Sequence, residues 1–476
     1  MKAWEVEELR RGMKGKWVVR GTRAFNGRIC TDSRKAAEGD LFVAIVGENH
    51  DAHKYVGDVI ARGVAAVMVH EELPAEVVAA AGKAGVAIVQ VDDTVAGLNR
   101  LAGAYRGELR AKVIAVGGSN GKTTAKRILH TILAEKFNGH ASPKSFNNNI
   151  GMPLTILEVE SGHEFVVLEI GTNAPGEIAA LGAVCRPDIA VITSIGLEHL
   201  EKLGDLEGVA REEASIAAFL KTGGTLVLPA EAPELMTALK MVGGQRILVG
   251  TEKPGAGSQK PIAADLVGTD IRESMAGVSF SLNGRGRYEL PLLGEHNVLN
   301  ALLAMAVARR MGVSDEQIVR GLAKVKPAEG RLEPMTVGSH PLIHDAYNAN
   351  PSSMEAALKT FGRIEGSGRK VAVLGDMLEL GETSELMHRS VGAMVVGFKM
   401  DVLVAIGPMM QHAAAVAAAA GGVEVQRFAS TAEARLGIAN VIKDGDAILL
   451  KGSHGMALET LLGVLGRMDA TPALAH

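Results

Sequence analysis

Residues 117–124, GGSNGKTT, combine three glycines, a lysine and two threonines at a spacing that favours phosphate binding. An apolar run at 113–116 precedes them and a helical pattern reaching about Leu133 follows, so the glycines occupy a turn between a buried strand and a helix. In such a turn the backbone N–H groups and the positive end of the helix face a bound anion. Lys122 adds a point charge, and Thr123 can supply a hydroxyl to Mg²⁺.

The segment departs from the strict pattern G-x-x-x-x-G-K-[ST], because Val116 stands where that pattern has its first glycine. An ordinary glycine turn is therefore the alternative interpretation. We favour phosphate binding, because the G-K-T-T run falls where the loop meets the helix. The residues expected to form the loop are Gly118, Ser119, Asn120, Gly121, Lys122, Thr123 and Thr124.

A carboxylate and an imidazole follow two further apolar strands. Glu169 lies near the end of the run 165–170, and His199 follows the run 189–193. An acid at the end of an apolar strand usually has a metal or a charged partner. Ligands of parallel sheets bind beyond the carboxyl ends of the strands, so we expect both side chains near the phosphate loop, in contact with metal or substrate. For His199 alone, a surface position is the alternative.

Carboxamides form a third group of candidates. Asn148 belongs to a run of three amides at 147–149, which offers donors and acceptors to a substrate or simply forms a turn. Asn297 and Asn300 are three residues apart at the start of an apolar helical segment and therefore share one face. They could contact an adenine edge or serve as N-cap residues.

Two more polar clusters lie near the ends of the chain. Thr31-Asp32-Ser33-Arg34 precedes the first apolar strand and could bind a phosphate or a uracil edge, or form a solvated turn. In the last third of the chain, polar loops follow three strands at 345–351, 375–377 and 451–454. Because these loops are expected at one sheet edge, they indicate a second functional surface.

Strands and helices alternate along the whole chain, which predicts an α/β fold with mostly parallel sheets. We expect three domains: a small α/β domain at 1–108, a central phosphate-loop domain at 109–330 and a Rossmann-like domain at 331–476. The segments 278–282 and 288–291 alternate in polarity and predict an antiparallel pair late in the central domain. The other expected strands are 41–46, 65–69, 86–91, 113–116, 165–170, 189–193, 225–228, 342–344, 370–374, 402–406, 423–428 and 447–450.

The composition of the chain excludes several other classes of protein. Hydrophobic residues form 47% of the 476, which is ample for aliphatic cores, and a net charge of −4 argues against a general nucleic-acid binder. Cys30 and Cys185 lie far apart and neither has a metal-ligand spacing. The charged N-terminus predicts no signal peptide, and no apolar run is long enough to span a membrane. We expect a cytoplasmic protein.

These motifs together resemble the Mur ligase family of ATP-dependent amide-bond synthetases, over essentially the whole chain. DAYNANPSSM and GDMLELG resemble the branch that joins D-alanyl-D-alanine to UDP-N-acetylmuramoyl-tripeptide in peptidoglycan precursor synthesis. The other resembling stretches are TDSR, GDLFVAIVGENHDAH, GGSNGKTT, SFNNNIGMP, LEIGTNAPGEI, ITSIGLEHLE, GEHNVLNALLA, GRLE, VLGDMLELGETSELMH and KGSHGMALE.

The resemblance implies ATP and Mg²⁺ as cofactors and a monomer built from a nucleotide-sugar domain, an ATP domain and a closing dipeptide domain. The peptide carboxylate would attack the γ-phosphate to form an acyl phosphate, which the dipeptide amine would then capture. The implied roles are Gly118 to Thr124 on the ATP phosphates, Thr123, Glu169 and His199 on metal, Asn297 and Asn300 on adenine, Arg331 on the γ-phosphate, Asp345 on ribose, Ser33 and Arg34 on uridine, and Asn148, Asn348, Asn350 and Asp376 on the peptide substrates.

Two positions depart from the family pattern. Glu213 stands where most members have a lysine that is carbamylated to give a metal-facing carboxylate, and we interpret it as a replacement for that charge, directly or through water. Glu213→Ala should then lose Mg²⁺-dependent activity, while the wild type should be indifferent to bicarbonate. A solvated helix glutamate is the alternative. His454 stands where the family usually has an arginine, which weakens a charge-based role for the last loop.

Other functions share parts of this pattern. A sibling ligase acting on another nucleotide-linked or folate-linked acid would share the ATP site and differ in the third domain. A phosphate-loop NTPase switch would leave the loops at 345–351 and 375–377 unused. A non-catalytic binding module would not need Lys122, Glu169 and His199.

Overall fold

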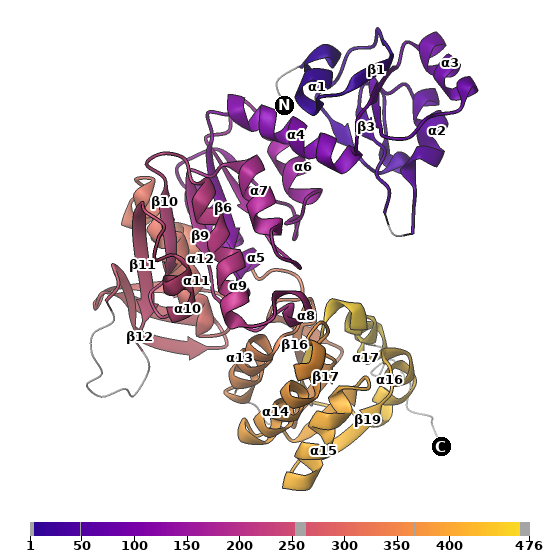
Figure 1. The fold of residues 1–476 in the computed structure, drawn as a ribbon. Helices are drawn as coiled ribbons and strands as arrows, with labels where there is room; N and C mark the ends of the chain where they lie inside the picture. Colours follow the sequence, from indigo (N-terminus) through magenta and orange to yellow (C-terminus); the bar gives the residue numbers. More distant parts are fainter. Residues whose placement is uncertain (1–3, 48, 253–262, 365–367, 467–476) are drawn as a thin grey trace.

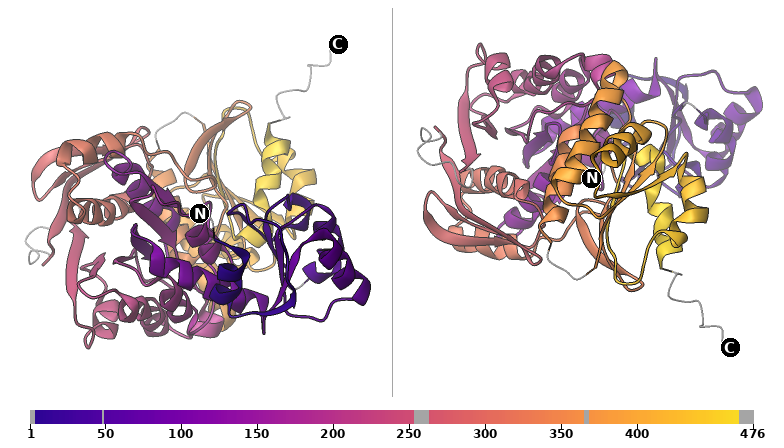
Figure 2. Two further views of the ribbon diagram at one scale, coloured as in Figure 1. Left: turned by 90° about the horizontal axis from the view of Figure 1, so that it is seen from above. Right: turned by 90° about the horizontal axis from the view of Figure 1, so that it is seen from below.

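The computed structural model describes residues 4–47, 49–252, 263–364 and 368–466. Three sheets follow one another along the chain, and most of their strands are parallel, which confirms the predicted α/β fold. The three units form an open arc: the central unit lies at the bend, and the N-terminal and C-terminal units extend from it toward the same side (Figures 1 and 2). Within the described ranges, no helix combines the length and apolarity needed to cross a bilayer.

The N-terminal sheet has the order β1-β5-β4-β3-β2, with β1 antiparallel to β5 and the other pairs parallel. Its last helix, α4, packs on α1 of this unit and also on α6 and α7 of the central unit, so one helix belongs to both hydrophobic cores. The elements are β1 Lys16–Val19, β2 Ile29–Cys30, β3 Leu41–Val43, β4 Ala66–Val69, β5 Ala87–Gln90, α1 Val6–Met13, α2 Val56–Ala61, α3 Ala75–Ala84 and α4 Thr94–Glu108.

The central sheet has nine strands in the order β14-β13-β12-β11-β10-β9-β6-β8-β7. Its strands are β6 Lys112–Gly117, β7 Gly139–Ala141, β8 Phe165–Glu169, β9 Ile189–Ile192, β10 Thr225–Pro229, β11 Gln245–Thr251, β12 Leu266–Ser274, β13 Gly277–Leu282 and β14 Arg285–Leu290. Because β6 pairs in parallel with both β8 and β9, the loops after these three strands meet at one edge.

Helices cover both faces of the central sheet, which explains why its middle strands are continuous apolar runs. One face packs against α5 Lys122–Leu133, α11 His296–Arg310 and α12 Asp315–Ala323. The other packs against α4 together with α6 Gly151–Leu157, α7 Glu177–Cys185 and α10 Pro233–Ala238. Two further helices, α8 Leu200–Leu203 and α9 Leu206–Ala214, follow β9.

The C-terminal sheet has the order β15-β16-β20-β17-β18-β19, and only β15 is antiparallel. Its strands are β15 Glu333–Val337, β16 His340–Asp345, β17 Lys370–Gly375, β18 Val402–Ile406, β19 Glu424–Phe428 and β20 Ala447–Lys451. One face packs against α13 Pro351–Gly362, α14 Ser384–Gly397 and α15 Met410–Ala420, and the other against α16 Thr431–Gly437 and α17 Leu462–Leu465.

The sequence did not predict six of the described strands; four of them lie at sheet edges, whereas β11 and β12 lie inside the central sheet. The six are β1, β2, β7, β11, β12 and β15, several of which are short or half exposed and therefore lack a long apolar run. The predicted antiparallel pair is confirmed as β13 and β14.

Candidate active site

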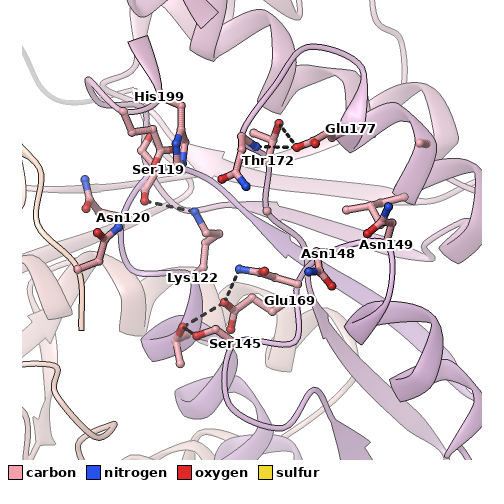
Figure 3. Close-up of a pocket in the computed structure, with 18 of the residues that line it drawn as sticks. Ser119, Asn120, Lys122, Ser145, Asn148, Asn149, Glu169, Thr172, Glu177 and His199 are labelled. Carbon is pink, nitrogen blue, oxygen red and sulfur yellow. Dashed lines mark hydrogen bonds and ion pairs between the residues drawn. The ribbon is translucent and has the colours of Figure 1, made fainter. Parts of the chain in front are cut away.

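A cavity of about 770 Å³ opens at the carboxyl ends of β6, β8 and β9. All three units contribute to its wall: Asp93 and Asn99 from around α4, Lys122 and Glu169 from the central unit, and Asn348 from the C-terminal unit. Figure 3 shows that its labelled side chains from the phosphate loop and from the loops after β8 and β9 converge on one space.

The phosphate loop needs glycine at two positions. Gly118 has φ +111°, and a Cβ there would lie 2.4 Å from Thr193 Oγ1 and 2.7 Å from Thr193 N. Gly121 has φ +85°, and a Cβ there would lie 2.5 Å from Asn300 Oδ1. Only glycine adopts such a backbone without strain in so little space, so these residues let the loop pass close to β9 and α11.

The loop amides divide into two sets. Gly118 N–H donates to Glu213 Oε2 at 2.7 Å, and the N–H groups of Ser119 and Asn120 donate to Ser194 O and Ser194 Oγ. The amides of the first turn of α5, which begins at Lys122, have no acceptor within the helix and remain available to an anion. The anion site is therefore the start of α5.

Lys122 folds back over its own loop. Its Nζ donates to Gly118 O at 2.5 Å and to Ser119 O at 3.3 Å, as Figure 3 shows for Ser119. The ammonium group lines the cavity in this position, so a small rotation would transfer it from these carbonyls to a phosphate oxygen.

Oxygen atoms gather beside the loop. Thr123 Oγ1 donates to Glu169 Oε1 at 3.1 Å and lies 3.3 Å from Ser145 Oγ. Asn147 Nδ2 donates to the same Glu169 oxygen at 3.2 Å. A carboxylate and two hydroxyls suit a hard cation such as Mg²⁺, so this donor set fits the metal that the sequence predicts.

Lys126 shares the carboxylate of Glu169. Its Nζ lies 2.8 Å from Glu169 Oε2, and burial lowers the pKa of this lysine while Glu169 partly offsets the effect. Lys126 lies four residues after Lys122 and therefore on the same helix face. A cation bound at Glu169 would compete with this ammonium group.

His199 lies on the cavity wall but contacts a residue of the C-terminal unit. Its Nδ1 is 2.5 Å from Glu379 Oε2, and its Nε2 is 3.9 Å from Glu198 Oε2. His199 and Glu379 both have positive φ, 50° and 63°, a conformation that few non-glycine residues adopt.

Glu213 lies beneath the phosphate loop rather than in the cavity. Its side chain is fully buried, and Oε1 has no hydrogen-bond partner among the described residues. Burial raises the pKa of Glu213 to about 7, although the nearby Lys122 opposes this shift. In this arrangement the carboxylate supports the loop through Gly118 and does not line the cavity.

The predicted nucleotide residues surround a second, adjoining cavity of about 250 Å³, whose wall includes Asn297, Asn300, Arg331 and Asp345. Asn300 Nδ2 donates to Asn297 Oδ1 at 2.9 Å, so the two carboxamides form one unit. Arg331 lines both cavities, and its guanidinium lies 4.3 Å from the centre of the Tyr347 ring.

Asp345 is held by two partners. Oδ2 accepts from Lys451 Nζ at 2.7 Å, and Oδ1 accepts from the backbone N–H of Leu332 at 3.0 Å. Burial lowers the pKa of Lys451, and Asp345 acts against that shift. Both carboxylate oxygens therefore accept hydrogen bonds at the connection between the central and C-terminal units.

The structure brings three of the six predicted substrate residues to the cavity. Asn148, Asn348 and Asn350 line it. Ser33 and Arg34 lie in the N-terminal unit outside its lining, and Arg34 pairs with Asp32. Asp376 is buried and caps α15, accepting from Met409 N and Met410 N, so its carboxylate does not reach the cavity.

Several residues that line the cavity or contact its wall were not predicted individually. Asn147 and Ser145 belong to the amide-rich stretch that the sequence marked, and Lys126 could have been found from its four-residue spacing to Lys122. Glu379 gave no signal of its own, because its contact with His199 spans 180 residues of sequence.

Comparisons with known proteins agree on one family. Residues 116–308 match the Mur ligase middle domain, and residues 330–454 match the Mur ligase glutamate ligase domain. The UDP-N-acetylmuramoyl-tripeptide--D-alanyl-D-alanine ligase of Bacillus subtilis (strain 168) is 36% identical over 91% of this chain and 92% of its own length. The protein of the same name from Escherichia coli (strain K12) is 32% identical over 92% and 93%.

Solved structures show the same likeness. A MurF structure from Acinetobacter baumannii aligns with a TM-score of 0.85 and 32% identity, over 98% of this chain and 99% of that one. The MurF ligase of Thermotoga maritima in complex with ADP aligns with a TM-score of 0.79 and 25% identity, over 94% and 98%.

Proposed function

Because this chain belongs to the Mur ligase family, we propose that it joins D-alanyl-D-alanine to UDP-N-acetylmuramoyl-tripeptide at the expense of ATP. It is an ATP-dependent ligase that forms a peptide bond in peptidoglycan precursor synthesis. Its relatives at 36% and 32% identity carry that activity in their names, and the likeness extends over more than nine-tenths of each chain.

The observation that carries the proposal is a single cavity bounded by all three units. A ligase of this type must hold a nucleotide, an acid and an amine together, and aligning reactants can supply on the order of 7–11 kcal/mol of the barrier. We assign the nucleotide sugar to the N-terminal unit, ATP to the central unit and the dipeptide to the C-terminal unit. A phosphate-loop switch would not need the Asn348 side of the cavity.

Two bond-forming steps account for the reaction. A carboxylate oxygen of the tripeptide attacks the γ-phosphorus of ATP, ADP leaves, and an acyl phosphate forms. The amine nitrogen of the dipeptide then attacks the acyl carbon, inorganic phosphate leaves, and the amine proton is lost. The first step is needed because a free carboxylate is a poor electrophile, and it gives the acyl carbon a phosphate leaving group for the second step.

This chain's residues have distinct parts in those steps. The first turn of α5 binds phosphate oxygens, and Lys122 moves from Gly118 O and Ser119 O to offset their charge. Arg331, on the wall of both cavities, faces the γ-phosphate side. Thr123 and Glu169 would hold Mg²⁺, and His199, which bonds Glu379 in this structure, would be a further ligand. Bound Mg²⁺ supplies positive charge against the phosphates.

Phosphate release tests the proposal. The purified protein is incubated with ATP and Mg²⁺, with UDP-N-acetylmuramoyl-tripeptide, and with or without D-alanyl-D-alanine. We expect sustained release only when both substrates are present. Release without either substrate would indicate an NTPase switch, and release with another amine but not with the dipeptide would indicate a sibling ligase.

A further inference from the structure

Asn120 lies in the phosphate loop, yet its side chain is bonded to another domain. Its Oδ1 accepts from Asn350 Nδ2 at 2.9 Å, and its Nδ2 donates to Ser352 Oγ at 3.0 Å. Its backbone is fixed to the central sheet instead, since its N–H donates to Ser194 Oγ and its carbonyl accepts from Thr193 Oγ1 at 2.6 Å. One residue therefore connects the end of β9 to the start of α13.

The three side chains form a closed ring of hydrogen bonds. Asn120 donates to Ser352, Ser352 Oγ donates to Asn350 Oδ1 at 3.1 Å, and Asn350 donates back to Asn120. Every donor in the ring points in the same sense, an arrangement in which each bond polarises the next. Asn350 Oδ1 also caps α13 by accepting from Ser353 N at 2.9 Å, so the ring includes the helix cap itself.

The ring engages both ends of the Asn120 carboxamide and leaves one Nδ2 hydrogen, and the residue lies on the wall of both cavities. The neighbouring residues of the same loop, from Gly121 to Thr124, line the cavity and begin α5. On the C-terminal side, Asn348 and Asn350 line the same cavity just ahead of α13. The ring therefore joins the phosphate loop directly to the part of the cavity wall that Asn348 and Asn350 form, where we place the incoming amine.

We propose that Asn120 is a positioning residue that latches the C-terminal domain over the phosphate loop and so presents the amine substrate to the activated acid. The proposal rests on the ligase function given above and adds a role that the loop motif itself does not assign. We expect domain closure and use of the dipeptide to depend on the Asn120 side chain more strongly than ADP affinity does, because both ends of its carboxamide are bonded within the ring.

The variants Asn120→Ala, Ser352→Ala and the double variant test the latch, with Asn138→Ala as a matched control. Asn138 is a carboxamide of the central unit whose side chain donates within that unit, to Gly162 O. Closure is followed by fluorescence transfer between dyes at Met241→Cys and Leu436→Cys, which are exposed on the central and C-terminal units. The native cysteines, Cys30 and Cys185, are buried.

We expect Asn120→Ala to bind ADP within about twofold of wild type in calorimetry. Its closed fraction should fall, and its kcat/KM for D-alanyl-D-alanine should fall about tenfold, because two hydrogen bonds of ordinary strength are lost. The double variant should be no worse than Asn120→Ala, since both changes open the same ring. Asn138→Ala should match the wild type in all three measurements.

Two results would overturn the latch. One is a loss of ADP affinity of tenfold or more with an unchanged closed fraction, which would make Asn120 a nucleotide ligand. The other is an unchanged closed fraction and dipeptide dependence in both single variants. If Asn120→Ala does not fold, Ser352→Ala tests the same ring, because Ser352 lies on the surface of α13. Failure of the ligase function itself would appear separately, as wild-type phosphate release without dipeptide.

Discussion

Glu213 shows how one residue links the phosphate loop to the helices behind it. Its Oε2 accepts the Gly118 N–H, while Oε1 has no partner within the described part of the chain. A buried carboxylate with a single hydrogen bond is costly when charged, and this explains why burial raises its pKa to about 7.

The raised pKa predicts a pH-dependent stability. Below about pH 4.5 the group is protonated in both the folded and the unfolded protein; between about pH 4.5 and 7 the folded protein retains the proton and loses stability as pH rises. Above pH 7 the full penalty of about 3 kcal/mol applies. We therefore expect the melting temperature of Glu213→Gln to rise relative to wild type between pH 5 and 7.5. A constant difference across that range would contradict this account.

Lys122 supplies the charge that the phosphate loop otherwise lacks. Lys122→Ala should lower kcat by at least about 100-fold, because a charge aimed at the transferring phosphoryl group acts mainly in the transition state. The measurement is phosphate release with both substrates present. Lys136→Ala, whose ammonium bonds Gly312 O far from the cavity lining, is the control and should retain activity.

At the scale of elements, the ends of parallel strands carry the polar groups. Asp345 and Lys451 lie opposite each other at the ends of β16 and β20, and their buried ion pair also holds the Leu332 N–H ahead of β15. A strand register set by apolar side chains thus places a pair of opposite charges at the edge that faces the nucleotide cavity.

Removing one member of this pair should destabilise the C-terminal unit. Lys451→Met leaves the Asp345 carboxylate buried and uncompensated, and we expect a loss of about 3–5 kcal/mol of unfolding free energy. Lys451→Met combined with Asp345→Leu should recover much of that loss, because neither charge then remains. The unfolding free energies of the variants are compared by chemical denaturation, followed with a probe in the C-terminal unit. An equal loss of unfolding free energy in the single and double variants would refute the explanation.

At the scale of the whole molecule, contacts across the cavity set the distance between the central and C-terminal units. The Asn120 ring and the His199–Glu379 pair both cross this boundary. Both include exposed side chains, since Glu379 is 57% exposed and Ser352 of the ring is also exposed. An exposed pair contributes about 0–1 kcal/mol and each hydrogen bond of Asn120 about 0.5–1.5 kcal/mol, so the ring should contribute more to closure than the His199–Glu379 pair. Ion pairs of Lys359 and Arg363 with Glu295, and of Arg363 with Glu273, also cross the boundary.

The variant Glu379→Gln tests whether the Asn120 ring contributes more to closure than the His199–Glu379 pair does. We expect the equilibrium constant for closure to change by less than about fivefold. A pair that contributes at most about 1 kcal/mol cannot shift this equilibrium further. The dye pair described for the latch gives the measurement, with Asn120→Ala as the comparison. A larger effect for Glu379→Gln than for Asn120→Ala would show that the imidazole–carboxylate pair controls closure.

The sequence by itself determined the local chemistry of this protein. The apolar runs at 113–116 and 402–406 predicted buried strands, which are observed as β6 and β18, and the glycines with Lys122 and Thr123 marked the phosphate loop, because backbone conformation and burial pattern depend on neighbouring residues. The resemblance of the motifs added the family, which the comparisons confirm.

Only the tertiary structure decided which of those groups act on one another. It placed Asp376 on a helix cap, Glu213 beneath the loop and Glu379 against His199, contacts that join residues tens to hundreds of positions apart. Such pairings depend on how whole sheets are positioned by packing, and a side chain's type and neighbours along the chain carry no record of that arrangement.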